Sequence, residues 1–117
     1  YVNAQGQVMH SQYYPAGTTG VVTAKVITDP NVAFQAQLDG PGAQTVLGTN
    51  TFFAAVQSTS TGSTRTGNST SALESTVQTA AAAFRVVGFA SPAGDAYTDV
   101  LVKFNPSAHS YLNAVGL

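Results

Sequence analysis

The stretch "NVAFQAQLDG", residues 31–40, alternates apolar and polar side chains with a period of two. On an extended chain, one face would carry the four apolar residues Val32, Phe34, Ala36 and Leu38. This alternation is typical of a β-strand that has one buried face and one solvated face. The turn-forming sequence Asp39-Gly40-Pro41-Gly42 follows directly, so we expect the strand to end there.

Other segments of the chain show the same strand character. The sequence predicts strands in "GVVTAKVITDP" (20–30), "TNTFFAAVQS" (49–58), "AAAAFRVVGFA" (80–90) and "YTDVLVKFNP" (97–106). Short strands separated by Gly, Pro and Asn favour a mostly β fold, an antiparallel β-sandwich or a small β-barrel. The segment "SALESTVQTAAAA" (71–83) leaves two alternatives, because its alanines favour a helix while its Ser and Thr residues and the strand after it argue against one.

The composition limits the partners that the chain is expected to have. With 117 residues it is long enough for one core, and residues 1–117 are predicted to form a single β domain. Only 8% of the residues are charged, where about 25% is usual, so neutral polar side chains or other proteins must cover much of the surface. The cations Lys25, Arg65, Arg85 and Lys103 are scattered along the sequence, which predicts no nucleic-acid partner. No apolar run approaches the roughly 18–20 residues that cross a bilayer, so no membrane partner is expected.

The run "STSTGSTRTGNSTS", residues 58–71, contains ten Ser or Thr in fourteen positions. Small hydroxyl side chains bury too little apolar area to offset the entropy of ordering, which predicts a long exposed loop. A second interpretation is an arm that becomes ordered by pairing its backbone with a neighbouring chain. Residues 1–18 are likewise predicted to form an extended arm.

The residues that usually carry chemistry are few and dispersed. His10 and His109 lie at opposite ends of the chain, and no nucleophile motif surrounds either of them. Asp95 and Asp99 are four residues apart, but turn chemistry, with the Asp95 side chain capping its own backbone, explains them better than a cation site. The chain has no cysteine. We therefore expect no enzymatic activity, no metal and no cofactor.

Pairs of adjacent aromatic residues are a further feature. Tyr13-Tyr14 and Phe52-Phe53 are neighbours in sequence, and neighbouring residues of a strand point to opposite faces. One phenylalanine of the second pair is therefore expected outside the main core. Low charge combined with outward aromatic side chains is typical of the core of a protein interface.

Four segments together resemble the head decoration (cement) proteins of tailed bacteriophages. They are "ITDPNVAFQAQLDG" (27–40), the Ser/Thr run, "FRVVGFA" (84–90) and "DAYTDVLVKFNPSAHSY" (95–111). They are similar, in the same order, to a family pattern of a "DP…F.VQ" strand, a Ser/Thr-rich segment, an "LR(V/I)(V/L)G" strand and a "VLVK(F/I)N…H.Y" C-terminus. The resemblance spans residues 24–113, and it departs at "FASPAG" (89–94), where relatives have a longer charged turn.

The resemblance implies a non-enzymatic virion structural protein. Such a protein lies on the outer surface of an icosahedral phage capsid, where it clamps neighbouring shell subunits. The implied partners are the major capsid protein and further copies of the chain itself, as a homotrimer. The interface residues expected for this role are Tyr13, Tyr14, Pro15, Asn105, His109 and Tyr111. The alternative function is that of a β-sandwich carbohydrate-binding, adhesin or fibre domain, which should show an aromatic platform on one face.

Overall fold

The computed structural model describes residues 1–54, 62, 63, 65–109, 111 and 112. Contacts divide the chain into two compact units. One unit comprises Tyr1–Thr28 and Thr59–Thr70, and the other comprises Asp29–Ser58 and Ser71–Leu117. All four strands, and therefore the core, belong to the second unit, which we call the sheet unit.

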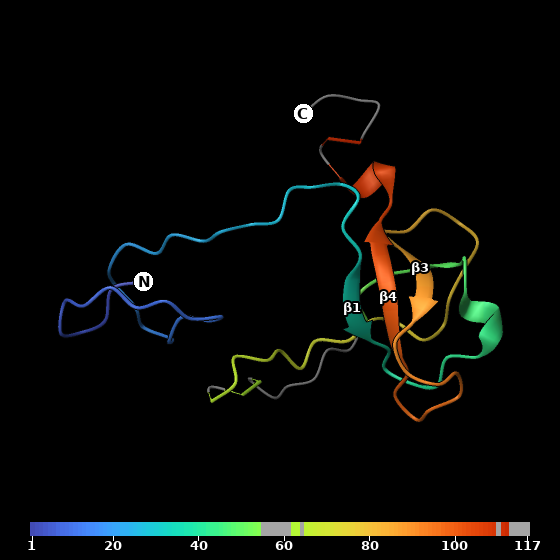
Figure 1. The fold of residues 1–117 in the computed structure, drawn as a ribbon, viewed down its shortest axis with the longest axis horizontal. Helices are drawn as coiled ribbons and strands as arrows, with labels where there is room; N and C mark the ends of the chain where they lie inside the picture. Colours follow the sequence, from blue (N-terminus) through green and yellow to red (C-terminus); the bar gives the residue numbers. More distant parts are fainter. Residues whose placement is uncertain (55–61, 64, 110, 113–117) are drawn as a thin grey trace. The chain divides into compact units, whose positions relative to one another are not determined.

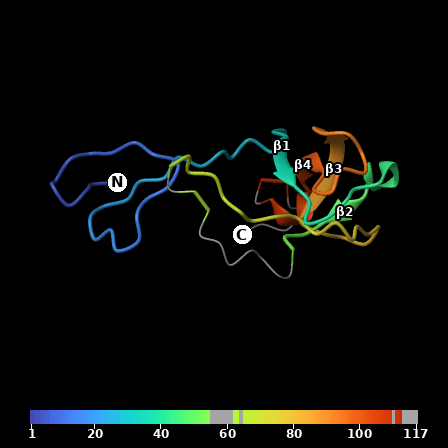
Figure 2. The same ribbon diagram turned by 90° about the horizontal axis from the view of Figure 1, so that it is seen from below.

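The sheet unit is built on one antiparallel sheet of four strands (Figure 1). The strands are β1 (Phe34–Gln37), β2 (Asn50–Thr51), β3 (Phe84–Phe89) and β4 (Asp99–Phe104). Figure 2 shows their order across the sheet, β1-β4-β3-β2, so that the last strand in sequence lies next to the first. A mostly β fold is thus confirmed. The second sheet that a sandwich requires is not found among the described residues.

The strand register separates the sheet into two faces. Phe34 lies opposite Val102, and Val102 lies opposite Val86, so these side chains share one face. The next residues along the strands point to the other face, and exposure alternates accordingly in β1, β3 and β4. The one-sided alternation predicted from residues 31–40 is therefore present.

The core lies on one face of the sheet. It consists of Leu38, Val46, Leu73, Phe84, Val86, Val100 and Val102. Three core residues lie outside the strands: Leu38 directly follows β1, a short 3-10 helix, η1 (Gln44–Val46), provides Val46, and the segment 71–83 provides Leu73. Irregular chain rather than a second sheet thus buries this face.

The segment 71–83 contains no helix. Leu73 forms a parallel bridge to Leu38 and an antiparallel bridge to Phe53, and it is only 2% exposed. The helical alternative is therefore wrong. The bridges satisfy backbone groups while placing Leu73 in the core, and such tertiary context overrides the helix propensity of alanine.

Two predicted strands differ from the structure. The segment 20–30 forms no strand, and its side chains are exposed up to residue 29. The segment 49–58 forms only the two-residue strand β2 and a bridge at Phe53, while residues 55–58 lie outside the described part of the chain. β-branched composition favours a strand only where another strand supplies the hydrogen bonds, and composition does not reveal that partner.

The other unit begins with a short hairpin. Val2 bridges Val8, the Met9 amide donates to the Tyr1 carbonyl at 2.7 Å, and Gly6 forms the turn with a φ of 79°. The positive φ explains the glycine, because side chains with a Cβ rarely adopt that conformation. Beyond the hairpin this unit has no strand among its described residues, and residues 58–61 and 64 of the predicted Ser/Thr loop lie outside them.

The two units differ sharply in burial. None of the residues 1–28 is buried. Eight of the large apolar side chains of this segment are among the most exposed of the chain: Val8, Met9, Tyr13, Tyr14, Val21, Val22, Val26 and Ile27. Across the described residues, no helix has the length and apolar character that crossing a membrane requires.

Candidate functional site

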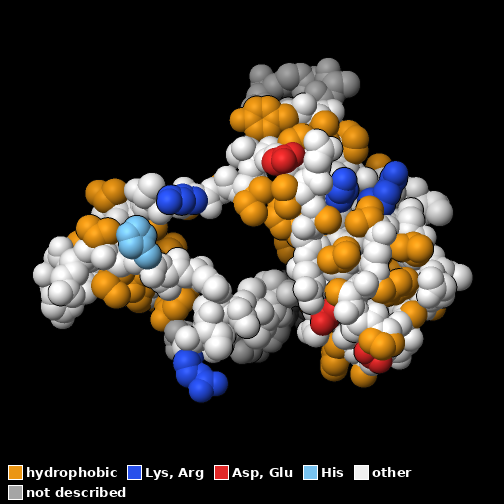
Figure 3. Space-filling model, viewed as in Figure 1, with side chains coloured by type: hydrophobic (Ala, Val, Ile, Leu, Met, Phe, Trp, Pro, Cys, Tyr) orange, Lys and Arg blue, Asp and Glu red, His pale blue; other side chains and the backbone are white. Residues whose placement is uncertain are grey.

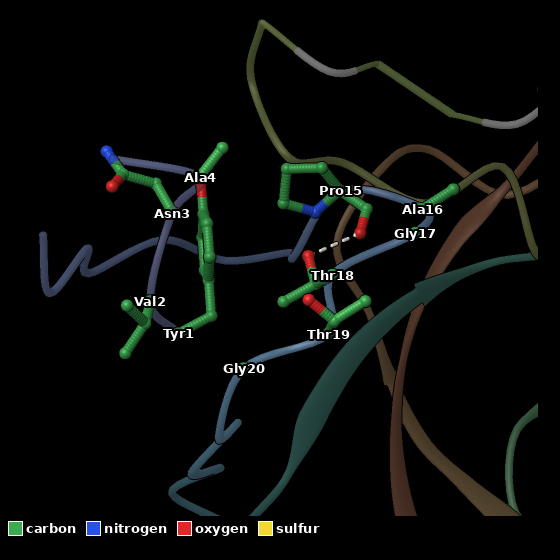
Figure 4. A pocket seen from close by; sticks show the side chains of 10 residues that line it. All are labelled: Tyr1, Val2, Asn3, Ala4, Pro15, Ala16, Gly17, Thr18, Thr19 and Gly20. Carbon is green, nitrogen blue, oxygen red and sulfur yellow. Dashed lines mark hydrogen bonds between the residues drawn. The ribbon is translucent and has the colours of Figure 1, made fainter. Parts of the chain in front are cut away.

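The predicted N-terminal interface residues line two open hollows of the first unit. Pro15 lines a hollow of about 400 Å³ between residues 1–4 and residues 15–20. Figure 4 shows these two segments on either side of it, with the Thr18 hydroxyl donating to the Pro15 carbonyl at 2.7 Å. Tyr13 and Tyr14 line a larger hollow of about 610 Å³ and are 37% and 58% exposed. All three residues thus lie at the surface of this unit.

The C-terminal candidates fall into two groups. Asn105 is only 8% exposed, and its side-chain Nδ2 donates to the Ala82 carbonyl at 2.8 Å and to Asn50 Oδ1 at 3.1 Å. It thus has little surface with which to contact another chain, and its amide instead attaches the end of β4 to the segment before β3. His109 and Tyr111 follow the 3-10 helix η2 (Pro106–Ala108) and are more accessible.

An aromatic chain connects this C-terminal segment to the core. Ring centroids are 5.2 Å apart between Phe53 and Phe84, 4.8 Å between Phe84 and Phe104, 6.2 Å between Phe104 and His109, and 5.7 Å between His109 and Tyr111. All four pairs are edge-to-face or tilted, which suits the quadrupoles of the rings. The aromatic chain is buried at Phe84, which is 5% exposed. The rings at its two ends, Phe53 and Tyr111, are 61% and 71% exposed.

Both members of the Phe52-Phe53 pair are exposed, which differs from the expectation for them. One phenylalanine of Phe52-Phe53 was expected to leave the core, but both are substantially exposed, at 43% and 61%. The strand ends at Thr51, so strict alternation does not continue through the pair. Ala54, which is 4% exposed, is the residue that turns inward after them.

A pair of cations on the sheet unit could not be predicted from the sequence. Arg85 of β3 lies directly opposite Lys103 of β4 in the strand register, on the face away from the core. Figure 3 shows the two cationic side chains of this unit close together. Both strands were predicted, but their pairing register was not, so residues that are scattered in sequence become neighbours in space.

The Arg85 side chain is hydrogen-bonded to a buried polar network, which is formed by Asn50 and Asn105. Its Nε donates to Asn50 Oδ1 at 3.3 Å, and the Nδ2 of Asn50 donates to the Ala80 carbonyl at 2.9 Å. Asn50 is 7% exposed and also accepts from Asn105. The base of the guanidinium group is thus fixed, while its remaining N–H groups have no partner among the described residues.

Two aspartate side chains accept backbone hydrogen bonds, Asp29 within a local turn and Asp39 from a residue 36 positions away in the sequence. Asp29 Oδ1 accepts from the Asn31 amide at 2.8 Å, and Asp39 Oδ1 accepts from the Ser75 amide at 2.8 Å. At Asp95 the backbone makes the hydrogen bonds, since its carbonyl accepts from the Thr98 hydroxyl at 3.1 Å. Side-chain capping was thus expected at the wrong aspartate. Among the described residues, no three His, Asp or Glu side chains gather in a way that could hold a metal ion.

Comparison with known proteins adds no further constraint, because no protein-family model, curated protein or solved structure matches the chain. A function can therefore be assigned only from the features of the surface. They are the exposed apolar residues of 1–28, the exposed ends of the aromatic chain, and the Arg85/Lys103 pair.

Proposed function

We propose that this chain is a non-enzymatic structural protein of a virus particle that binds the outside of an icosahedral phage capsid. The observation that carries the proposal is the exposure of the apolar side chains of residues 1–28. This segment carries eight large exposed apolar side chains and has no buried residue. Monomeric proteins rarely leave so much apolar surface uncovered, and such surface usually marks a contact with another protein.

The proposed mechanism is stabilisation by binding. A protein that binds only the assembled shell shifts the equilibrium toward that shell by mass action, without chemistry of its own. The partners would be the major capsid protein and two further copies of the chain in a homotrimer. Many repeated copies would turn modest individual contacts into a strong restraint.

The surfaces assigned to these contacts are the N-terminal residues Tyr13, Tyr14 and Pro15 and the C-terminal residues His109 and Tyr111. Tyrosine is favoured at interfaces because a large apolar ring is combined with a hydroxyl that can find a polar partner. The low charge of the chain supports the same interpretation, because charged residues are depleted at interface cores. The Asn105 side chain, being buried, would act on the C-terminal contact only by holding its segment.

Quantitative densitometry of gradient-purified particles would test the proposal directly. The amount of this chain is measured against the major shell protein of the same particles. A ratio near one to one is expected for a shell-wide protein. A handful of copies would indicate a tail or fibre part, and complete absence from the particles would contradict the proposal.

Variants can then locate the contact. Replacing Tyr13 and Tyr14 by alanine should weaken binding to shells that lack this chain. Tyr97→Ala is a matched control, because Tyr97 is 63% exposed and lies on the sheet unit outside the proposed contacts. Equal binding of both variants would remove the N-terminal residues from the interface.

One observation favours the alternative of a carbohydrate-binding or fibre domain. The exposed rings of Phe53 and Tyr111 end an aromatic chain, and sugar sites commonly use exposed aromatic rings. A glycan array distinguishes the two functions. Saturable binding that Tyr111→Ala abolishes would favour the alternative, whereas an absence of binding together with stoichiometric particle association would favour the capsid role.

A further inference from the structure

The face of the sheet opposite the core, which we call the outer face, carries the side chains of Gln35, Gln37, Asn50, Arg85, Val87, Asp99, Leu101 and Lys103. The two glutamines, Arg85 and Val87 are exposed, Asp99, Leu101 and Lys103 are half-buried, and Asn50 is buried. No other described strand covers this face.

The Arg85/Lys103 pair is electrostatically incomplete. Residues directly opposite on neighbouring antiparallel strands have Cβ atoms about 4.5–5.5 Å apart, and like charges in that position are destabilising. Neither side chain forms an ion pair with a carboxylate among the described residues. Asp99 shares the outer face, but it lies four residues from Lys103 along β4, or about 13 Å at ~3.3 Å per residue.

A hydrogen bond orients Arg85, and a β-bulge lies next to it in β3. The bond from Arg85 Nε to Asn50 Oδ1 orients the guanidinium group, which reduces the rotamer entropy that a contact would cost. A β-bulge follows at once, because the register shifts between Val86 and Gly88. Val87, the extra residue, is 44% exposed beside the cations. Bulges are frequent where a strand presents side chains for a function.

The charge of the whole unit indicates what kind of anion would bind. The sheet unit contains all five carboxylates of the chain but only two of its four Lys and Arg residues. Its net charge is therefore negative, and a polyanion such as nucleic acid would be repelled at long range. Short-range binding of one or two carboxylates on a protein surface does not require the sheet unit to have a net positive charge. Arginine binds carboxylates in a bidentate manner.

We propose that the outer face is a docking surface for an acidic patch of a neighbouring protein, in which Arg85 and Lys103 bind carboxylates. Gln35 and Gln37 would supply amide hydrogen bonds beside them, and Val87 and Leu101 would supply apolar contact. This inference rests on the proposed function for the identity of the neighbour, which would be a shell subunit.

The chain provides a matched control for the test. The double variant R85Q/K103Q removes two positive charges from the outer face. R65Q is the matched control for the single variant K103Q, because Arg65 is an exposed cation that lies neither on the outer face nor in residues 1–28. Binding to shells assembled from the major capsid protein of the same genome is measured by co-sedimentation at ~50 mM and ~500 mM salt. The single variant K103Q guards against loss of folding, because the Lys103 side chain makes no hydrogen bond with the described residues.

R85Q/K103Q is expected to bind shells at least ~30-fold more weakly than the wild type, since breaking desolvated charge pairs has effects of this size or larger. Its affinity should also depend less on salt, because fewer screened contacts remain. K103Q should also bind more weakly than the wild type, whereas R65Q should bind as the wild type does. If the wild type binds and R85Q/K103Q binds equally well, the outer face is not the docking surface, although the proposed function stands.

A second measurement does not depend on the shell. A peptide of alternating Gly and Glu is titrated into ¹⁵N-labelled protein and followed by NMR, with a DNA duplex of equal charge as the comparison. Shifts confined to the outer face that vanish in R85Q/K103Q are expected with the peptide. An absence of shifts there, or tighter binding of the DNA, would overturn the inference. Failure of the wild type to bind shells would refute the proposed function while leaving this result to decide the inference.

Discussion

Replacing Asn105 by alanine tests the buried polar network that connects the ends of the sheet. The variant loses the hydrogen bonds from Nδ2 to the Ala82 carbonyl at 2.8 Å and to Asn50 Oδ1 at 3.1 Å. Asn50 Oδ1 keeps its bond from Arg85, but no other described residue donates a hydrogen bond to the Ala82 carbonyl. A buried acceptor without a donor is costly, because water cannot replace the lost partner.

The magnitude follows from these two bonds. Each buried hydrogen bond contributes about 0.5–1.5 kcal/mol net, and two are lost. Because the Ala82 carbonyl is left without a donor, the free energy of unfolding should fall by an amount in the upper part of the summed range, about 2–3 kcal/mol. For a domain of 60–100 residues, 1 kcal/mol shifts the Tm by about 4–8 °C. The Tm of Asn105→Ala should therefore fall by about 10–20 °C.

Thermal unfolding followed by far-UV circular dichroism measures this shift. Asn31→Ala is the matched control, because Asn31 is exposed and its side chain makes none of the hydrogen bonds seen in the structure, and it should change stability by less than about 0.5 kcal/mol. The folded Asn105→Ala variant should bind shells like the wild type at low temperature. A Tm within about 2 °C of the wild type would refute the structural role, and weak shell binding with an unchanged Tm would restore Asn105 as an interface residue.

Three further variants test the packing of the sheet unit. Leu73→Ala should lower the free energy of unfolding in urea by about 2–5 kcal/mol, because the side chain is 2% exposed and its removal leaves a cavity in the core. Gly42→Ala should cost about 1–3 kcal/mol in the same assay, since an added Cβ would lie 2.8 Å from Leu38 Cδ1. An unchanged urea midpoint would contradict the packing at either position. Thr98→Val removes the hydroxyl that accepts from the Gly42 amide at 2.8 Å. Hydrogen exchange of that amide should become about tenfold faster, as for the loss of about 1.4 kcal/mol, and an unchanged exchange rate would argue against the bond.

The strands of the sheet were the part of this protein that the sequence determined best. Residues 31–40, 80–90 and 97–106 each contain the strand that their alternation predicts, because the period of two reports which side chains one face can bury. The mostly β class follows from these strands alone. The low charge and the paired aromatic residues are also properties of the sequence, and they directed attention to contacts with other proteins.

Only the tertiary structure decided how these parts combine. It left residues 20–30 without a strand partner, placed Leu73 in the core instead of in a helix, and buried the Asn105 side chain that had been expected at an interface. It also set Arg85 opposite Lys103, although the two residues are eighteen positions apart in the sequence. Each of these outcomes depends on strand pairing and register, which arise from contacts between residues far apart in the chain. Local patterns contain no information about such contacts, so the outer face became visible only in the folded protein.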